Sequence, residues 1–147
     1  MSIQDLINQL EKDGEYRVLK KLDLNQTYNE DDGSDKKIAI FLDTETTGTD
    51  VDHDQIIELG MVAFEYNSDS GKIYRILSEF NELEEPTIDI SEEASKVHGI
   101  SMEMLKGKKI NDDDVMKFIS KAGIILAHNA TFDRQITEKR FPFFSDK

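Results

Sequence analysis

The chain has no cysteine among its 147 residues, which excludes disulfide bonds and thiolate metal sites. The lack of cysteine also fits a reducing compartment, so we expect a cytoplasmic protein. No run of apolar residues is long enough to span a bilayer. The first ten residues carry no basic region of the kind that opens a secretory signal. We therefore expect neither a membrane partner nor export.

Basic residues are also scarce, because 18 Lys and Arg face 31 Asp and Glu and the formal net charge is −13. Non-specific affinity for nucleic acid comes from Lys and Arg that neutralise phosphates. The composition thus argues against a general electrostatic grip on DNA or RNA. It still allows an enzyme that takes one nucleic-acid end into a metal-filled cleft, since bound divalent ions invert the local charge. A partner protein that supplies the affinity is equally compatible.

The sequence also lacks a glycine-rich phosphate loop, which argues against a phosphotransferase that uses another cofactor. Its length suits one domain with a real core. Apolar residues at helical spacing, interrupted at Asp13-Gly14, predict two short helices within residues 4–24. They form either a packed appendage or a docking arm. The polar stretch after them predicts a linker, so we divide the chain into an N-terminal helical extension (1–35) and a main domain (36–147).

The main domain predicts a mixed α/β sheet. Apolar and alternating segments indicate strands over 37–43, 55–66, 72–80 and 123–127, with the second and third paired as an antiparallel hairpin. The fourth strand, an unbroken apolar run, is expected to be buried, and the first and fourth strands are expected to be neighbours. Capping residues predict helices after Ser91, Ser101, Asn111 and Asn129, and Pro142 ends the last. The acids at 112–114 suit a helix start better than a metal site.

Asp43 and Glu45 form the most informative motif. They follow the apolar strand at 38–42 and precede a Thr/Gly turn. Residues i and i+2 of a strand point to the same face, so the two carboxylates project side by side. Such a pair repels unless a cation lies nearby, and Mg²⁺ is bound by a few carboxylates together with substrate phosphates. A charged strand end that leads into a loop is the alternative.

A second motif runs from Ala127 to Asp133, where a strand meets a helix whose first turn carries an acid. Ligand sites in α/β sheets lie at the carboxyl ends of the strands. If the first and fourth strands are neighbours, Asp133 comes to the Asp43/Glu45 pair. Three carboxylates then suffice for two divalent ions, which would activate a water and stabilise a leaving oxygen in phosphoryl displacement.

The two motifs together resemble a known family. Asp43-Thr-Glu-Thr-Thr-Gly48 and His128-Asn-Ala-Thr-Phe-Asp133 resemble the first two exonuclease motifs of the DEDD superfamily, in particular the DnaQ-like epsilon-subunit type of DNA polymerase III. The segments 97–101 and 56–60 resemble further parts of that family. The resemblance covers about residues 37–142 and implies a ribonuclease H-like fold.

The resemblance also implies roles. Asp43, Glu45 and Asp133 would be the catalytic residues and bind Mg²⁺ or Mn²⁺. Thr46, His98 and Phe132 would contact the 3′-terminal nucleotide of a single-stranded DNA end, and a DNA polymerase subunit would be a partner. From the residues alone, His98 equally suits a turn cap, and a core position is the commoner one for a residue such as Phe132.

The family's third motif, a histidine followed by an aspartate, is absent: none of the residues after Asp133 is histidine. We therefore expect the closing C-terminal strand and helices of the fold to be missing. Phe141, Phe143 and Phe144 would then form an exposed apolar cluster without a helix or strand of its own. Three functions stay open: a metal-dependent 3′–5′ exonuclease, a non-catalytic module that binds a partner, nucleic acid or nucleotide, and an oligomer assembled through the exposed phenylalanines.

Overall fold

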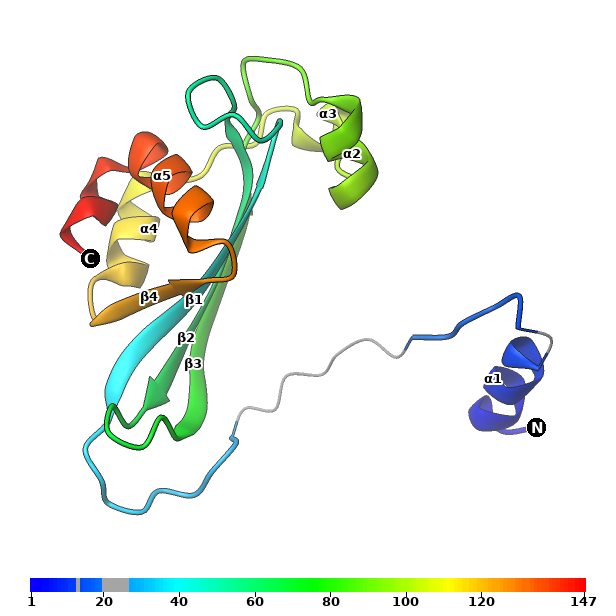
Figure 1. The fold of residues 1–147 in the computed structure, drawn as a ribbon, viewed down its shortest axis with the longest axis horizontal. Helices are drawn as coiled ribbons and strands as arrows, with labels where there is room; N and C mark the ends of the chain where they lie inside the picture. The colour runs from blue at the N-terminus through cyan, green and yellow to red at the C-terminus, as the bar shows by residue number, and fades with distance from the viewer. Residues whose placement is uncertain (13, 20–26) are drawn as a thin grey trace.

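The computed structural model describes residues 1–12, 14–19 and 27–147 (Figure 1). In chain order its elements are α1 (Ile3–Glu11), β1 (Lys37–Thr46), β2 (Ile56–Tyr66), β3 (Ile73–Leu83), α2 (Glu92–His98), α3 (Met102–Leu105), α4 (Asp112–Ile119), β4 (Ile124–Ala127), α5 (Ala130–Arg140) and a 3₁₀ helix, η1 (Pro142–Asp146). Among the described residues, no helix is both long and apolar enough to cross a membrane.

The four strands form one mixed sheet in the order β3-β2-β1-β4. β1 pairs antiparallel with β2, and β2 pairs antiparallel with β3. β4 joins the other side of β1 in parallel, with Leu42 opposite Ala127. The predicted hairpin, the adjacency of the first and fourth strands and the mixed α/β class are therefore confirmed. Parallel pairing brings the carboxyl ends of β1 and β4 to the same edge.

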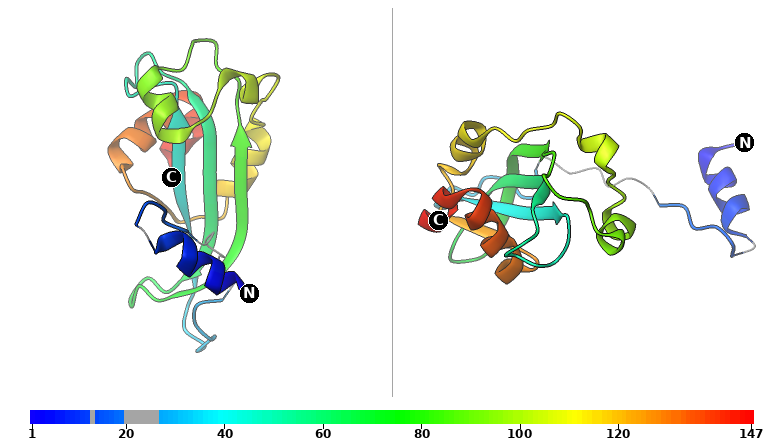
Figure 2. Two further views of the ribbon diagram at one scale, coloured as in Figure 1. Left: turned by 90° about the vertical axis from the view of Figure 1, so that its right-hand side faces the viewer. Right: turned by 90° about the horizontal axis from the view of Figure 1, so that it is seen from above.

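The core lies between the sheet and one group of helices. α4, α5 and η1 lie together beside the sheet in Figure 1, and their apolar side chains meet Ile40 and Leu42 of β1 in one cluster. α2 and α3 lie at the far end of the hairpin, as the views of Figure 2 also show. A smaller cluster of Ile57, Ile100 and Leu105 anchors them there. The end of β1 is thus flanked by α5 and by α2.

The N-terminal extension contains α1, which has no buried residue. A capping box between Ser2 and Asp5 caps the N-terminus of this helix. Figure 1 shows α1 away from the sheet. The second helix predicted for this extension is absent from residues 14–19, and the rest of that prediction lies outside the described residues. Part of the expected linker is docked on β3, because Thr27 bridges Arg75 and the Tyr74 hydroxyl donates to Asp32.

Three local predictions were wrong. β4 is an edge strand and Ile124 is 41% exposed, so the strand is not buried. Asn129 precedes α5 but makes no side-chain cap; its carbonyl accepts from the amides of Phe132 and Asp133. Phe143 and Phe144 belong to η1 and Phe141 directly precedes it; Phe141 and Phe144 are buried in the main core and Phe143 packs against it half-buried.

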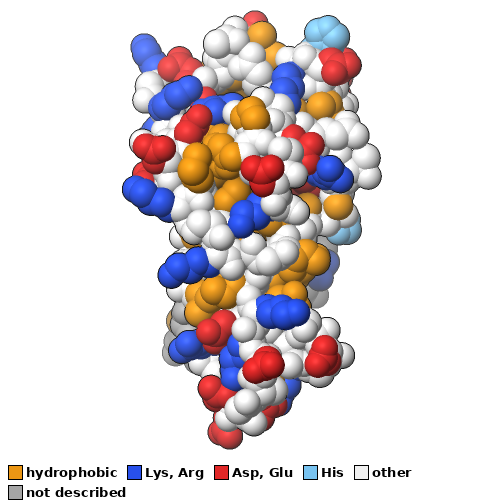
Figure 3. All heavy atoms as spheres, turned by 90° about the vertical axis from the view of Figure 1, so that its left-hand side faces the viewer, with side chains coloured by type: hydrophobic (Ala, Val, Ile, Leu, Met, Phe, Trp, Pro, Cys, Tyr) orange, Lys and Arg blue, Asp and Glu red, His pale blue; other side chains and the backbone are white. Residues whose placement is uncertain are grey.

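The burial of these rings removes the exposed cluster on which self-association was predicted. Their centroids lie 5.7–6.0 Å apart, the spacing of packed aromatic rings. Figure 3 views the side that carries α5 and η1, and it shows hydrophobic patches interspersed with charged side chains of both signs. Local sequence identified the apolar segment, but the helix that packs it onto the sheet is a product of tertiary structure.

Candidate active site

The two carboxylates of the first motif lie within β1, which continues to Thr46 beyond the predicted end of the strand. β2 remains paired along this stretch, with Asp43 opposite Gly60 and Glu45 opposite Glu58. A register shift follows between Glu45 and Thr46. β4 stops opposite Leu42, so α5 rather than a strand adjoins this part of β1. Because β4 ends early, side chains of α5 can reach the last residues of β1.

Asp133 meets β1 through Thr44. The Thr44 hydroxyl donates to Oδ1 of Asp133 at 2.7 Å, and the Asp133 side chain is almost fully buried. Because neighbouring residues of a strand point to opposite faces, Thr44 faces away from Asp43 and Glu45. Sequence reasoning missed Thr44, although the alternation that paired the two acids also pointed the threonine toward the helix.

The acids of the site nevertheless influence one another. Burial raises the pKa of Glu45; the nearby His98 lowers it, and the negative charges of Asp43, Glu58 and Asp133 raise it. Burial also raises the pKa of Asp133; the hydrogen bond from Thr44 opposes this shift and the charge of Asp43 adds to it. Burial and the neighbouring negative charges therefore make ionisation of Glu45 and of Asp133 less favourable than in water.

This acidic environment suits a divalent cation, since hard cations take carboxylate oxygens and would relieve the repulsion. The side chains are not gathered around one point, however: within residues 1–12, 14–19 and 27–147, no three His, Asp or Glu side chains form a group that could hold a metal ion. Oδ1 of Asp133 is engaged by Thr44. The donor chemistry fits Mg²⁺ or Mn²⁺, while the expected convergence of Asp43, Glu45 and Asp133 is not seen.

A cleft of about 770 Å³ lies beside these acids. Glu45, Thr46, His98 and Phe132 all line it, together with the start of the β1–β2 loop and part of α2. Asp43 instead lines a smaller neighbouring hollow with Glu58 and Asn81, and Asp133 lines one under η1. The structure therefore brings four of the six predicted residues into one cleft. Among the described residues that line it, none is Lys or Arg.

His98 caps a turn and also lines the cleft. Its Nδ1 accepts the backbone amide of Ile100 at 3.0 Å, which caps the turn after α2. Nδ1 is thereby fixed as an acceptor, so the ring proton of neutral His98 lies on Nε2. Nε2 is buried and has no hydrogen-bond partner among the described residues. A buried donor without a partner is unusual in a folded protein.

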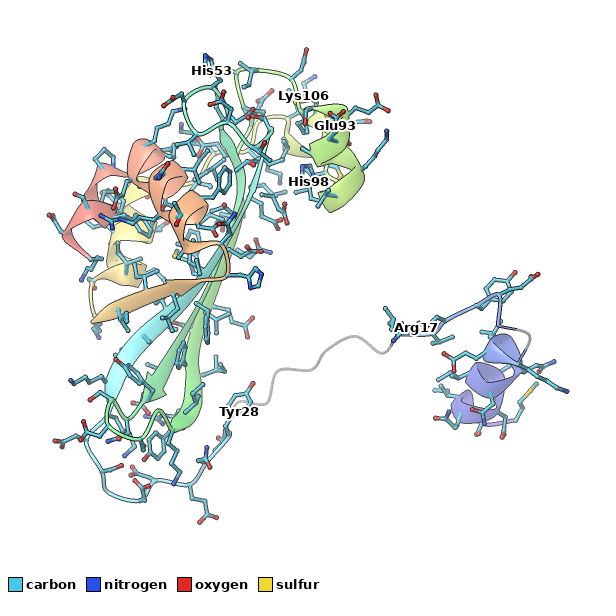
Figure 4. The ribbon with its side chains drawn as sticks, viewed as in Figure 1. Arg17, Tyr28, His53, Glu93, His98 and Lys106 are labelled. Atoms are coloured by element: carbon cyan, nitrogen blue, oxygen red, sulfur yellow. The ribbon has the colours of Figure 1, made fainter. Side chains whose placement is uncertain are left out.

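The side chains of Thr46 and Phe132 already make contacts within the protein. The Thr46 hydroxyl donates to the Gly48 carbonyl at 2.6 Å, so it shapes the turn. Phe132 is half-buried and packs against the main core while one side lines the cleft. Figure 4 shows His98 and Glu93 on α2 at the same end of the molecule as His53 of the β1–β2 loop. The cleft lies between this loop, α2 and the start of α5.

Comparison with known proteins decides the family, because the model of the exonuclease family matches residues 40–145. The chain belongs to this exonuclease family. The exonuclease domain is 36% identical over 96 residues to the PolC-type DNA polymerase III of Thermotoga maritima, covering 64% of this chain and 6% of that protein. It is 40% identical over 98 residues to the DNA polymerase III subunit epsilon of Rickettsia prowazekii, covering 64% of this chain and 40% of that protein.

The exonuclease domain thus spans less than half the length of these curated relatives. Its fold is also that of Escherichia coli Exonuclease I in complex with an oligonucleotide, with a TM-score of 0.56 at 19% identity over 69% of this chain and 23% of that one. The predicted resemblance to the epsilon type and to ribonuclease H-like exonucleases is confirmed.

Proposed function

We propose that this exonuclease domain is a metal-dependent 3′–5′ exonuclease that removes nucleotides from single-stranded 3′ ends of DNA. The observation that carries the proposal is the cleft, which is lined by Glu45, His98 and Phe132 together. A terminal nucleotide offers what this cleft lacks: acceptors for His98 and a base to pack on Phe132. The relatives are DNA polymerases or their subunits, which favours a DNA substrate and a polymerase partner. A cytoplasmic location is part of the same proposal.

Asp43, Glu45 and Asp133 are the residues that would hold Mg²⁺ or Mn²⁺. When bound, such ions activate water and stabilise the charge of the leaving oxygen. The chain itself contributes positioning. Thr44 holds the Asp133 carboxylate, and the β-strand pairing with β2 fixes Asp43 and Glu45 on one face. His98 would donate to the nucleotide, while the turn at Thr46 would present its backbone to the 3′ end.

The test is degradation of a 5′-labelled single-stranded oligonucleotide in Mg²⁺ or Mn²⁺. We expect a ladder that shortens from the 3′ end and disappears in Asp43→Ala. Asp113→Ala is the matched control, because it removes an equal charge from the exposed first turn of α4 and should leave the ladder unchanged. No ladder from folded wild-type protein would overturn the proposal.

A non-catalytic module is the second candidate, and His98 is the observation that favours it. With Nδ1 bound to the Ile100 amide and the proton on Nε2, His98 has no free nitrogen to act as a general base. A protein of this kind would bind a fluorescent single-stranded oligonucleotide in an anisotropy titration without shortening it. Turnover that depends on Asp43 would exclude this candidate.

A further inference from the structure

The β1–β2 loop forms one wall of the cleft and is built around Asp54. Its residues Gly48, Thr49, Asp50 and Asp54 all line the cleft. Oδ1 of Asp54 accepts from the Thr47 hydroxyl, and Oδ2 accepts from the Asp50 amide, both at 2.7 Å. Two bonds to one carboxylate tie the start of the loop to its end. The wall therefore has a defined shape of its own.

Gly48 is part of the same construction. A Cβ atom at this position would lie 2.5 Å from the Asp54 carboxylate, which cannot move aside without breaking its two hydrogen bonds. The loop therefore closes tightly on its own beginning. This fixes its internal shape, while its placement relative to the rest of the domain needs a separate contact.

Lys139, in the last turn of α5, supplies that contact. Its ammonium donates to the backbone carbonyls of Val51, Asp52 and Asp54 at 2.7, 2.8 and 3.1 Å. An ammonium has three donors and no acceptor, so the three carbonyls satisfy it completely. The loop also carries three aspartates, which makes a cation at its centre favourable.

The same helix that positions Asp133 therefore also positions the cleft wall. Asp133 lies in the first turn of α5 and Lys139 in its last, and an α-helix holds such positions at a fixed separation. We infer that Lys139 is a positioning residue, which clamps the β1–β2 loop to α5 and thereby sets the affinity of the cleft for the nucleotide end. This inference rests on the proposed function for its substrate.

A merely structural role predicts something different. An exposed lysine without a structural partner contributes little to stability and does not affect substrate binding in the cleft. Here the ammonium bonds neutral carbonyls of a wall that substrate would touch, and hydrogen bonds to charged groups are stronger than neutral ones. Loss of the clamp should therefore loosen one segment, residues 50–54, and weaken substrate binding rather than the chemical step.

The experiment compares Lys139→Ala with wild type in two measurements. Without substrate, we expect hydrogen exchange at the amides of His53 and Asp54 to quicken about tenfold, the low end for losing hydrogen bonds to a charged group. With a single-stranded oligonucleotide, we expect KM to rise about tenfold while kcat changes less than about twofold. Lys139→Arg keeps the charge and several donors and should recover most of both losses.

Arg134→Ala is the matched control, since it removes one positive charge from the exposed side of the same helix, where Arg134 pairs with Glu138. It should alter neither loop exchange nor KM. Unchanged exchange and KM in Lys139→Ala, or a loss of global stability alone in urea denaturation, would overturn the clamp. If wild type degrades no DNA, the proposed function fails, and Kd for a fluorescent oligonucleotide replaces KM in deciding the clamp.

Discussion

Thr44 and Asp133 are joined by a 2.7 Å hydrogen bond across a separation of 89 residues. The bond connects the middle residue of the Asp43-Thr-Glu45 motif to the acid of the second motif. It gives the threonine a role that neither neighbouring carboxylate can perform, because the strand turns Thr44 toward α5. The two motifs are therefore physically coupled by a neutral side chain.

Replacing Thr44 with valine tests this coupling. The change keeps the shape of the side chain but removes the donor, and the buried Asp133 carboxylate loses a partner. We expect the free energy of unfolding to fall by about 1–3 kcal/mol. Urea denaturation measures it. Thr44→Ser keeps the hydroxyl and should lose less than about 1 kcal/mol; equal losses in the two variants would contradict the role of the hydrogen bond.

Asp133→Asn tests the cost of ionising the buried acid. The folded-state pKa of Asp133 lies above the reference value of 3.8, so the folded protein binds the proton more tightly than the unfolded chain. The stability that protonated Asp133 contributes to the folded state is fully present below pH 3.8. This contribution is lost as the pH rises through the folded-state pKa of Asp133. Asparagine stays neutral, so the variant avoids this loss.

We therefore expect Asp133→Asn to be more stable than wild type at neutral pH, with the difference shrinking toward pH 3.8. Urea denaturation at about pH 3.5, 5 and 7 measures the trend. Burial, the main cause of the raised pKa of Glu45, is common to both proteins, and loss of the smaller contribution from the Asp133 charge favours the variant in the same direction. A difference that is constant over this range would show that ionisation of Asp133 is not its cause.

Divalent metal should stabilise the folded protein if the acids bind it. At 100 times its Kd, a ligand adds about 2.7 kcal/mol, and each kcal/mol raises the Tm of a domain of this size by roughly 2–4 °C. We expect Mg²⁺ or Mn²⁺ to raise the Tm of wild type and much less that of Asp43→Ala. NaCl at equal ionic strength is the control, because a net charge of −13 makes the chain sensitive to screening. An equal rise in NaCl would exclude specific binding.

Glu84 and Arg140 provide a structural prediction away from the cleft. Glu84 is buried and its carboxylate accepts from Nε of Arg140 at 3.1–3.2 Å, while Lys109 reaches it from solvent. Arg140→Ala leaves a buried charge with only an exposed partner, so we expect a loss of about 2–4 kcal/mol in urea denaturation. Lys109→Ala removes the exposed partner and should lose less than about 1 kcal/mol. The reverse order would contradict this assignment.

The features that could be predicted from sequence are those with local causes. Ser91, Ser101 and Asn111 cap their helices as expected, since each side chain accepts an amide three residues further along the chain. The hairpin of β2 and β3 follows from alternation and turn residues in the same way. The prediction that β1 and β4 are neighbours rests instead on the order of the elements along the chain.

The features that could not be predicted depend on which elements pack against each segment in the tertiary structure. Exposure of Ile124 is set by the position of β4 at the sheet edge, and burial of Phe141 by the turn that folds η1 back onto the core. The same holds for Lys139, whose partners are backbone carbonyls and therefore leave no trace in residue type. Side-chain chemistry was enough to identify the acids of the site. Asp133 is separated from Asp43 because it binds Thr44, which lies on the opposite face of the strand.

The parallel pairing of β1 with β4 has a consequence for the order of folding. β1, β2 and β3 are consecutive and can zip together from their turns, whereas β4 must return across the intervening helices to reach β1. Contacts between distant parts of a chain close slowly, because the loop entropy is lost before the contacts form. We therefore expect Asp43 and Glu45 to be set in place early and Asp133 to arrive with the last segment to dock. A partly folded chain would then carry the acidic pair without the Thr44–Asp133 hydrogen bond, and formation of this bond would report that folding is complete.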